Sequence, residues 1–539
     1  MKSYLVAINS KYIHPAMGVF SLVCNSKHDV IYDEFTIKDK QEKIINSILE
    51  KDYDILGFSI YIWNSTIVKN IIKELRKNNF NKPIFVGGPE CYFNSEMFIK
   101  EYNVNYVIFG EGEEAFNELI DYLDNKISIE EVSNLYYLEN DTVKFTYSKL
   151  PDINNIKHDL SLIKDFDHRV AYLESSRGCP FKCSYCMASL ETKVRFFPIE
   201  KVKNEIKYLL DNNCQTIKFL DRSFNINKDY MLEILKFIKD NDNGISVFQF
   251  EIVGDLLDKE VITYINENMR KDILRFEIGV QSTNDLTTKA VCRRQDFNKL
   301  KENINLLKDN VTLHVDLIAG LPYEDLLSFK NSFNQTYLLM GEELQLGFLK
   351  ELKGTKISNE KKSHDYKFDK EPPYEIINNK YITEQELDII RNVEESLEKF
   401  HNKGCYKRTM EYLFIENNLD PFDTFLSLTK NAPKQLKYLN DDESYSYLYN
   451  QLKTKVNAKK LLNNIKLDYL LKNKMKPKIW WDYSLTKEDR NKYFDIFNKQ
   501  YNIDSITYHN YSYVDVINNE IMLFIYKDNK VTVYKTKEL

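Results

Sequence analysis

Two long stretches of the chain, residues 1–125 and 169–355, alternate short apolar segments with amphipathic ones. In the first stretch, the apolar runs fall at residues 4–8, 54–60, 83–86 and 106–109. After the second run, Ile67, Ile71 and Leu75 recur at helical spacing. Short apolar strands that alternate with helices pack as a parallel sheet covered by helices. The pattern predicts a doubly wound, Rossmann- or flavodoxin-like α/β domain, whose ligand binds at the carboxyl ends of the strands.

The second stretch holds six apolar runs, and a polar or glycine-containing segment follows each of them. These segments begin at Glu174, Asp221, Glu251, Gly279, Ala319 and Lys353. Six β–α units with polar groups at the strand ends predict a partial (β/α)6 barrel. The chemistry of such a barrel takes place at the carboxyl ends of its strands. We therefore expect the six polar segments to surround one site.

Three of the eight cysteines lie together after the first of these runs. Cys179, Cys183 and Cys186 have the spacing C-x3-C-x2-C. Thiolates are the usual ligands of iron–sulfur clusters, and three thiolates leave one iron of a four-iron cluster open to a substrate or cofactor. A structural zinc ion normally takes four ligands, and no fourth cysteine or histidine lies nearby. Structural thiols are the other alternative, but Arg177-Gly178 and Lys182 predict an exposed, positively charged loop.

The cysteine motif, with Tyr185 directly before its last cysteine, resembles that of the radical S-adenosylmethionine (SAM) superfamily. The G-V-Q-S segment at 279–282 and the D-L-I-A-G-L-P segment at 316–322 extend the resemblance over most of the predicted barrel. The resemblance implies a 4Fe-4S cluster on the three cysteines, whose open iron binds the amine and carboxylate of SAM. Reduction of the cluster, by an electron donor such as flavodoxin or ferredoxin, then cleaves SAM to methionine and a 5′-deoxyadenosyl radical.

The same resemblance implies SAM-binding roles for residues at the strand ends. By position, these residues are Asp221, Glu251, Gln281, Arg293 and Asp316. Arg293 is expected to meet the SAM carboxylate, since a guanidinium pairs well with that group. Asp221 occupies the place of the amine-recognising motif without its glycine-rich form. For Asp221 and Glu277, pairing with a nearby arginine is an equally good alternative.

The glycine segments of the first domain, G-G-P-E at 87–90 and G-E-G-E at 110–113, resemble those of the cobalamin-binding domain that precedes many radical SAM domains. The cobalamin-binding residues implied by this resemblance are Ser59, Ser65, Gly87, Gly88, Gly110 and Gly112. The family's D-x-H-x-x-G motif is absent, and His14 in the nearest segment lacks the aspartate. Radical SAM relatives without that histidine bind cobalamin with no protein nitrogen on the cobalt. A generic flavodoxin-like module and a degenerate domain that binds nothing are the alternatives.

These observations divide the chain into a cobalamin-binding-like domain (1–135), a linker (136–168), a radical SAM barrel (169–355) and a C-terminal domain (356–539). We expect a hairpin beside the start of the linker, at 132–137 and 143–147. The C-terminal domain is predicted to be mainly helical with a terminal β-hairpin, and resembles an uncharacterised domain of cobalamin-type radical SAM proteins.

Net charge and the distribution of cysteines predict which partners and which cellular compartment the protein has. The net charge of −6 gives no basic field, so nucleic acid is an unlikely partner. No apolar run is long enough to span a bilayer, and the N-terminus lacks a cleavage site. With five of the eight cysteines scattered, the thiols suit the cytoplasm better than a disulfide framework.

The leading hypothesis is a cobalamin-dependent radical SAM methyltransferase that acts on an unactivated carbon. A cobalamin-linked radical rearrangement or oxidation without methyl transfer is one alternative. A sensor that binds SAM or cobalamin as a signal is another. A tRNA-modifying role is weaker, because no second cysteine triad and no basic domain occur. The sequence names no substrate.

Overall fold

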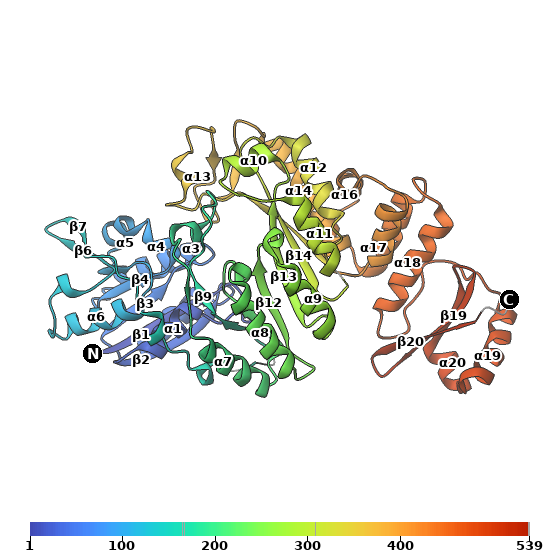
Figure 1. Cartoon of the computed structure of the whole chain (residues 1–539), viewed down its shortest axis with the longest axis horizontal. Helices are drawn as coiled ribbons and strands as arrows, with labels where there is room; N and C mark the ends of the chain where they lie inside the picture. The colour runs from blue at the N-terminus through green and yellow to red at the C-terminus, as the bar shows by residue number, and fades with distance from the viewer. Residues whose placement is uncertain (164, 167, 308, 537–539) are drawn as a thin grey trace.

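The computed structural model describes residues 1–163, 165–166, 168–307 and 309–536. Residues 164 and 167 of the predicted linker, and residues 537–539 of the predicted C-terminal domain, lie outside the described residues. Figure 1 shows three parts along the long axis of the molecule: the first sheet, a second sheet in the middle, and a C-terminal part at the far end.

The first part is built on one sheet in the order β2-β1-β3-β4-β5-β6-β7. Its strands are β1 (Lys2–Asn9), β2 (Asp29–Thr36), β3 (Ile55–Ser59), β4 (Ile84–Gly87), β5 (Tyr106–Ile108), β6 (Leu135–Glu139) and β7 (Thr142–Phe145). The strands β1 to β5 are parallel and follow the flavodoxin-like order 2-1-3-4-5. Sequence reasoning missed β2, an edge strand whose acidic residues interrupt its apolar pattern.

Helices cover both faces of this sheet. They are α1 (Met17–Asn25), α2 (Gln41–Glu50), α3 (Ser65–Lys77), α4 (Pro89–Tyr92), α5 (Ser95–Tyr102) and α6 (Glu113–Leu123). In β1, Tyr4 and Val6 join the core formed with α2, α3 and α5, while Leu5 and Ala7 join the core formed with α1 and α6. Successive side chains of a strand point to opposite faces. The doubly wound fold expected from the sequence is thereby confirmed.

The predicted hairpin belongs to the first sheet. Strand β6 pairs antiparallel with β5, and β7 pairs antiparallel with β6. The boundary at residue 135 therefore cuts a strand, and the connector to the second sheet starts only after β7. The turn residues Asn140 and Asp141 do form the hairpin turn, and both have positive φ values.

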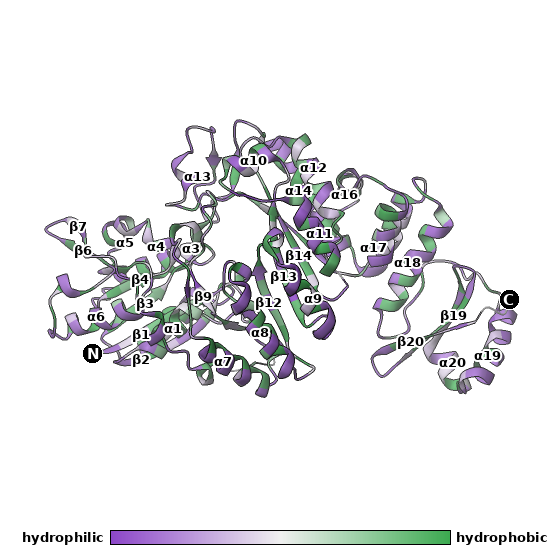
Figure 2. Ribbon diagram, viewed as in Figure 1, coloured by the Kyte–Doolittle hydropathy of each residue, from purple (hydrophilic) through white to green (hydrophobic). Residues whose placement is uncertain are grey.

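The second part is a sheet of six parallel strands in the order β15-β14-β13-β12-β11-β8. Its strands are β8 (Ala171–Leu173), β11 (Thr216–Phe219), β12 (Val247–Ile252), β13 (Leu274–Gln281), β14 (Thr312–Ala319) and β15 (Glu343–Phe348). Helices α7 (Ile199–Asp211), α8 (Lys228–Asp240), α9 (Lys259–Asn268), α10 (Asp285–Ala290), α11 (Phe297–Leu307) and α12 (Leu326–Tyr337) connect them. The open order of the strands confirms the partial barrel. Figure 2 shows green, hydrophobic strands beside helices with purple outer faces.

The short helix α13 (Lys356–Asn359) follows the second sheet, and β16 (Lys367–Phe368) and β17 (Ile376–Asn378) then form a two-stranded sheet. The rest of the chain is mainly helical up to its terminal sheet. The helices are α14 (Glu384–Leu397), α15 (Lys407–Glu411), α16 (Pro421–Lys430), α17 (Asp441–Leu452), α18 (Ala458–Lys472), α19 (Lys487–Tyr501) and α20 (Ser505–Tyr511). One hydrophobic core runs from the six-stranded sheet into α14 to α18. The predicted boundary at residue 356 is therefore not a break in packing.

The chain ends in an antiparallel sheet. The predicted hairpin is present as β19 (Glu520–Lys527) and β20 (Lys530–Thr536), and β18 (Ser512–Ile517) adds a third strand. This sheet has its own small core with α19 and α20. Among the described residues, no helix combines the length and apolar character that a membrane span requires.

Candidate functional site

The three-cysteine loop follows β8 and is held at several points. Its first residues form the strand β9 (Ser176–Arg177), which pairs antiparallel with β10 (Arg195–Phe196). Gly178 has φ +91°, and a Cβ there would collide with the carbonyl oxygen of Lys193, so this position requires glycine. The backbone N–H of Cys179 donates to Glu191 O at 2.9 Å. These contacts fix the loop without help from a ligand.

The three thiols of the loop differ in their exposure. Cys179 and Cys183 are buried, and Cys186 is half-buried. Burial raises the pKa of the Cys186 thiol, and negative charge on the two neighbouring thiolates raises it further. Within the described residues, no three His, Cys, Asp or Glu side chains converge on one ion. A cluster binds each thiolate through a different iron, so its ligands need not converge.

The expectation of an exposed loop was wrong at Arg177. Its side chain is only 13% exposed, because three carboxylates surround it. Lys182 is exposed, as expected. A charged residue in a loop is usually solvated, but two of the three carboxylates around Arg177 come from a distant segment of the chain.

Asp221 braces the start of the cysteine loop. Its carboxylate accepts hydrogen bonds from the Ser175 N–H (2.9 Å), the Ser175 hydroxyl (2.6 Å) and the Ser176 hydroxyl (2.5 Å). Burial raises the pKa of Asp221 to about 6, against the lowering effect of these hydrogen bonds. The alternative of an arginine partner does not hold for Asp221. Glu277 pairs instead with Lys218, at 2.8 Å.

Three of the other four predicted SAM-binding residues lie on neighbouring strands, and the fourth follows a helix. Glu251 is on β12, Gln281 ends β13, Asp316 is on β14, and Arg293 follows α10. A register shift in β13 and a φ of +67° direct the Gln281 side chain out of the regular ladder. Arg293 Nη1 lies 3.4 Å from Tyr185 Oη and 4.0 Å from Cys183 Sγ.

Two atoms on these strands fit an absent ligand. Gln281 Oε1 and Asp316 Oδ1 are buried, and neither has a hydrogen-bond partner in the structure. A buried polar atom without a partner costs about 1–3 kcal/mol, so each of these two oxygens would gain from a hydrogen bond donated by a ligand. SAM carries hydroxyl and amine donors that suit both acceptors. The residues therefore fit SAM beside the cysteines.

Replacing Asp316 by asparagine should stabilise the ligand-free protein at high pH. Burial, with the charges of Glu277 and Glu251, raises the pKa of Asp316 from its usual 3.8 to about 8. Between these values the folded chain binds more protons than the unfolded chain, so the free energy of unfolding falls as pH rises. D316N lacks this ionisation, and its stability advantage should grow by roughly 1–3 kcal/mol between pH 6 and 9.

Urea denaturation of ligand-free protein at both pH values measures this change. Asp240→Asn is the control, since Asp240 on α8 is exposed and does not contribute to the raised pKa of Asp316. An equal pH response in D316N and the wild type would contradict the assignment.

A cavity of about 310 Å³ opens at the carboxyl ends of β1, β3, β4 and β5. The predicted residues Ser59, Gly87, Gly88, Gly110 and Gly112 line it. A Cβ at Gly110 would meet no atom within 4 Å, so this backbone faces open space. The volume suits part of a large ligand, and the small residues permit its close approach. The cavity therefore fits a portion of cobalamin.

Two predicted features lie elsewhere. Ser65 does not line the cavity: its hydroxyl is buried 3.4 Å from Glu90 Oε1. The imidazole of His14 is half-buried, and its Nδ1 lies 2.7 Å from Tyr172 Oη, at the contact with β8. Burial lowers the pKa of His14. Its partner lies in the second sheet, so His14 serves the contact between the two parts.

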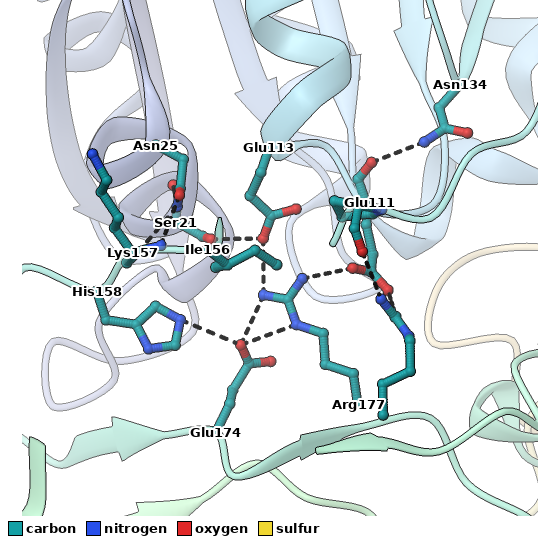
Figure 3. A network of polar contacts seen from close by, with 12 residues as sticks. Ser21, Asn25, Glu111, Glu113, Asn134, Ile156, Lys157, His158, Glu174 and Arg177 are labelled. Atoms are coloured by element: carbon teal, nitrogen blue, oxygen red, sulfur yellow. Dashed lines mark hydrogen bonds and ion pairs between the residues drawn. The ribbon is translucent and has the colours of Figure 1, made fainter. Parts of the chain in front are cut away.

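Sequence reasoning missed the polar wall of this cavity, which comes from both parts of the molecule. His158, Glu174 and Arg177 line it together with Glu111 and Glu113. Figure 3 shows the Arg177 guanidinium between the three carboxylates, which come from the G-E-G-E segment and from the end of β8. The one signal in the sequence is a charged residue, Arg177, directly before Gly178 at the start of the cysteine loop.

A second cavity, of about 530 Å³, lies next to the first, because Tyr61 and Pro89 line both. The cysteine loop contributes Tyr185, Cys186 and Met187, and the end of β15 contributes Phe348. Tyr61 stacks on Trp63 with ring centroids 4.4 Å apart, which gives the first domain a flat aromatic wall here. The second cavity thus lies between the first domain and the cysteine loop, next to the first cavity.

Family models match three regions of the chain. Residues 4–120 match the B12 binding domain, residues 173–335 the radical SAM superfamily, and residues 362–531 a protein family of unknown function, DUF4080. The first two matches agree with the domains expected from the sequence. The third covers most of the C-terminal region and assigns it no activity.

Two curated proteins are similar to part of this chain. The uncharacterized methyltransferase PH0819 of Pyrococcus horikoshii is 29% identical over 43% of this chain and 54% of its own length. The cobalamin-dependent radical SAM methyltransferase TokK of Streptomyces tokunonensis is 23% identical over 54% of this chain and 45% of its own length. This chain thus spans about half the length of these relatives.

A solved structure shows the same fold over most of the chain. The cobalamin-dependent SAM radical enzyme OxsB, with aqua-cobalamin bound, superposes with a TM-score of 0.61 at 14% identity. The match covers 86% of this chain and 79% of OxsB. At this identity the likeness concerns the fold alone.

Proposed function

We propose that this chain, a radical SAM superfamily protein with a B12-binding domain before its radical SAM domain, is a cobalamin-dependent methyltransferase that acts on an unactivated carbon. The observation that carries the proposal is the second cavity, which the cysteine loop and the B12-binding domain line together. When bound, a 4Fe-4S cluster with SAM supplies a radical that removes hydrogen from the substrate, and cobalamin supplies the methyl group. Cys179, Cys183 and Cys186 would hold the cluster.

The residues around the cysteines have separate tasks in this proposal. Gln281 and Asp316 present unpartnered oxygens to SAM, and Glu251 lies beside them. Arg293 is fixed by Gln295 Oε1 at 3.1 Å and by a hydrogen bond to Gly279 O, so its remaining donors can meet the SAM carboxylate. Asp221 acts indirectly, because its oxygens are used by Ser175 and Ser176.

The substrate is expected to occupy the second cavity. Its volume of about 530 Å³ lies within the usual range for small-molecule sites. The aromatic wall of Tyr61, Trp63 and Phe348 would exclude water from the reacting carbon. Water exclusion matters here, because a reactive intermediate must be kept from side reactions.

The products formed from SAM test this proposal. Anaerobically reconstituted protein, loaded with cobalamin and given SAM, a reductant and its substrate, should form 5′-deoxyadenosine and S-adenosylhomocysteine together. Mass spectrometry of both compounds makes the measurement, and the substrate should gain one CH2. Deoxyadenosine alone would favour a rearrangement or oxidation. Absence of both, with cluster and cobalamin bound, would favour a sensor.

We also propose a reducing cytoplasm as the location and a small redox protein, such as flavodoxin or ferredoxin, as the electron donor. The eight cysteines form no disulfide among the described residues. In the product assay a chemical reductant replaces the donor. Addition of reduced flavodoxin in its place should sustain deoxyadenosine formation.

A further inference from the structure

One ion-pair network joins the cobalamin cavity to the cysteine loop, and Arg177 lies at its centre (Figure 3). Arg177 Nη1 lies 2.8 Å from Glu111 Oε2, and its Nη2 lies 2.8 Å from both Glu113 Oε1 and Glu174 Oε2. Glu111 also pairs with Arg195 on β10. Glu111 and Glu113 belong to the first domain, while the other three residues belong to the second. A planar guanidinium can serve several carboxylates at fixed angles, which an ammonium group cannot.

Glu113 uses one carboxylate oxygen in this network, and its side chain also lines the cavity. Oε1 accepts the Arg177 bond and a 2.7 Å hydrogen bond from the Ser21 hydroxyl. Oε2 is buried and has no hydrogen-bond partner, although Glu113 lines the cavity. Burial would raise the pKa of Glu113, but Arg177 and Ser21 keep it below its usual value. An ionised oxygen at a cavity wall is suited to accept a hydrogen bond from an amide or hydroxyl of a ligand.

Arg177 also connects directly to the first cysteine of the loop. Its backbone pairs with Arg195 in the β9–β10 ribbon. Gly178 follows with φ +91°, at a position where a Cβ would collide with the carbonyl oxygen of Lys193, and Cys179 comes next. A shift of the Arg177 side chain would therefore be transmitted through a short, rigid segment to a cysteine of the loop. Arg177 is a positioning residue in this arrangement, since neither its side chain nor the ribbon need touch substrate.

We propose that Arg177 couples the cobalamin cavity to the three-cysteine loop, and that Glu113 Oε2 is the atom that contacts the occupant of the cavity. The inference rests on the proposed function, because it takes cobalamin as the occupant. Cobalamin carries amide donors around its ring, which are the groups that Glu113 would accept from. Cobalamin in the cavity would restrain the Glu113 side chain. Glu113 would in turn restrain Arg177, and Arg177 would restrain the cysteine loop.

The test compares hydrogen–deuterium exchange of the cysteine-loop peptides with and without hydroxocobalamin, using cluster-loaded, full-length protein. In the wild type, saturating hydroxocobalamin should slow exchange in these peptides at least about twofold. Glu113→Gln should raise the dissociation constant for hydroxocobalamin about tenfold, as expected for loss of a charged hydrogen bond. Arg177→Met, measured at a hydroxocobalamin concentration that saturates this variant, should lose the response of the loop.

Arg169→Met is the matched control. Arg169 is 8% exposed and pairs with Glu34 at 2.7 Å, so it also joins the two parts through a buried ion pair. It does not line the cavity and lies before β8. R169M should therefore keep the response. Iron content is measured for every variant. If R177M loses iron, E113Q at saturating hydroxocobalamin replaces it as the test variant and should lose the response of the loop.

The outcomes separate this inference from the proposed function. A wild-type slowing of loop exchange in R177M would overturn the coupling. If R177M loses iron, the same result in E113Q at saturating hydroxocobalamin would overturn it. Loss of the response in R169M as well would also overturn it, because any loosening of the two parts would then suffice. Wild-type protein that binds hydroxocobalamin without a change in the loop would contradict the inference alone. Wild-type protein that binds none would contradict the proposed function and the inference together.

Discussion

A variant with alanine at Cys179, Cys183 and Cys186 is expected to lose its cluster completely after anaerobic reconstitution. Iron should fall from about four atoms per chain to near zero, since thiolates hold such clusters. The described residues contain no group of three His, Cys, Asp or Glu side chains that could hold a metal ion in place of the loop. Iron and sulfide analysis, together with the brown absorbance of the cluster, makes the measurement.

The control for this variant is Cys292→Ser. Cys292 is exposed and follows Val291, whose carbonyl oxygen accepts the backbone N–H of Ser184 in the cysteine loop. Its thiol therefore tests whether any cysteine near the loop serves as a ligand. C292S should keep its full iron content. Retained absorbance in the triple variant, or zinc without sulfide in the wild type, would mean that the loop does not bind an iron–sulfur cluster.

Local sequence patterns were sufficient for most of the fold. The alternation of apolar strands with helices predicted both parallel sheets, because burial on both faces leaves nearly continuous apolar runs. It failed at β2 and β18. The first is an edge strand with acidic residues, and the second lies beside the predicted hairpin in a stretch that was not assigned a strand. The boundary at residue 135 failed because hydrogen bonding to β5 depends on tertiary contacts that a hairpin pattern does not contain.

In the candidate site, too, features set by local sequence could be predicted and features set by distant segments could not. The places of the cysteine loop and of the strand-end residues in the fold could be predicted, because each follows an apolar run of the sequence. Their roles as ligands stay predictions. The partners of Arg177 could not be predicted, since Glu111 and Glu113 lie more than sixty residues away in sequence. Ser65 shows the converse error: its place after a strand suggested a ligand contact, but the first turn of α3 directs its hydroxyl toward Glu90. Contacts between distant segments thus account for the missed residues.

Breaking one buried ion pair should strongly destabilise the C-terminal sheet. Lys466 Nζ on α18 lies 2.9 Å from Asp515 Oδ2 on β18, and the two side chains are 3% and 0% exposed. Asp515 also accepts hydrogen bonds from the Ser484 N–H at 2.9 Å and the Tyr513 hydroxyl at 2.7 Å. Removal of one partner leaves an uncompensated buried charge, which costs about 3–5 kcal/mol. Asp515→Asn should therefore destabilise the sheet by that amount.

Native-state hydrogen exchange in the β18 to β20 peptides measures this effect without requiring the whole chain to unfold in one step. Glu520→Gln is the matched control, because Glu520 on β19 pairs with Lys535 at 3.1 Å near the surface, and such pairs contribute about 0–1 kcal/mol. Lys466→Met combined with Asp515→Leu should recover much of the loss, since an apolar pair can replace a buried ion pair. Equal protection in D515N and the wild type would contradict the account. Iron content should stay unchanged in all three variants, because the sheet lies at the far end of the molecule from β9, which begins the cysteine loop (Figure 1).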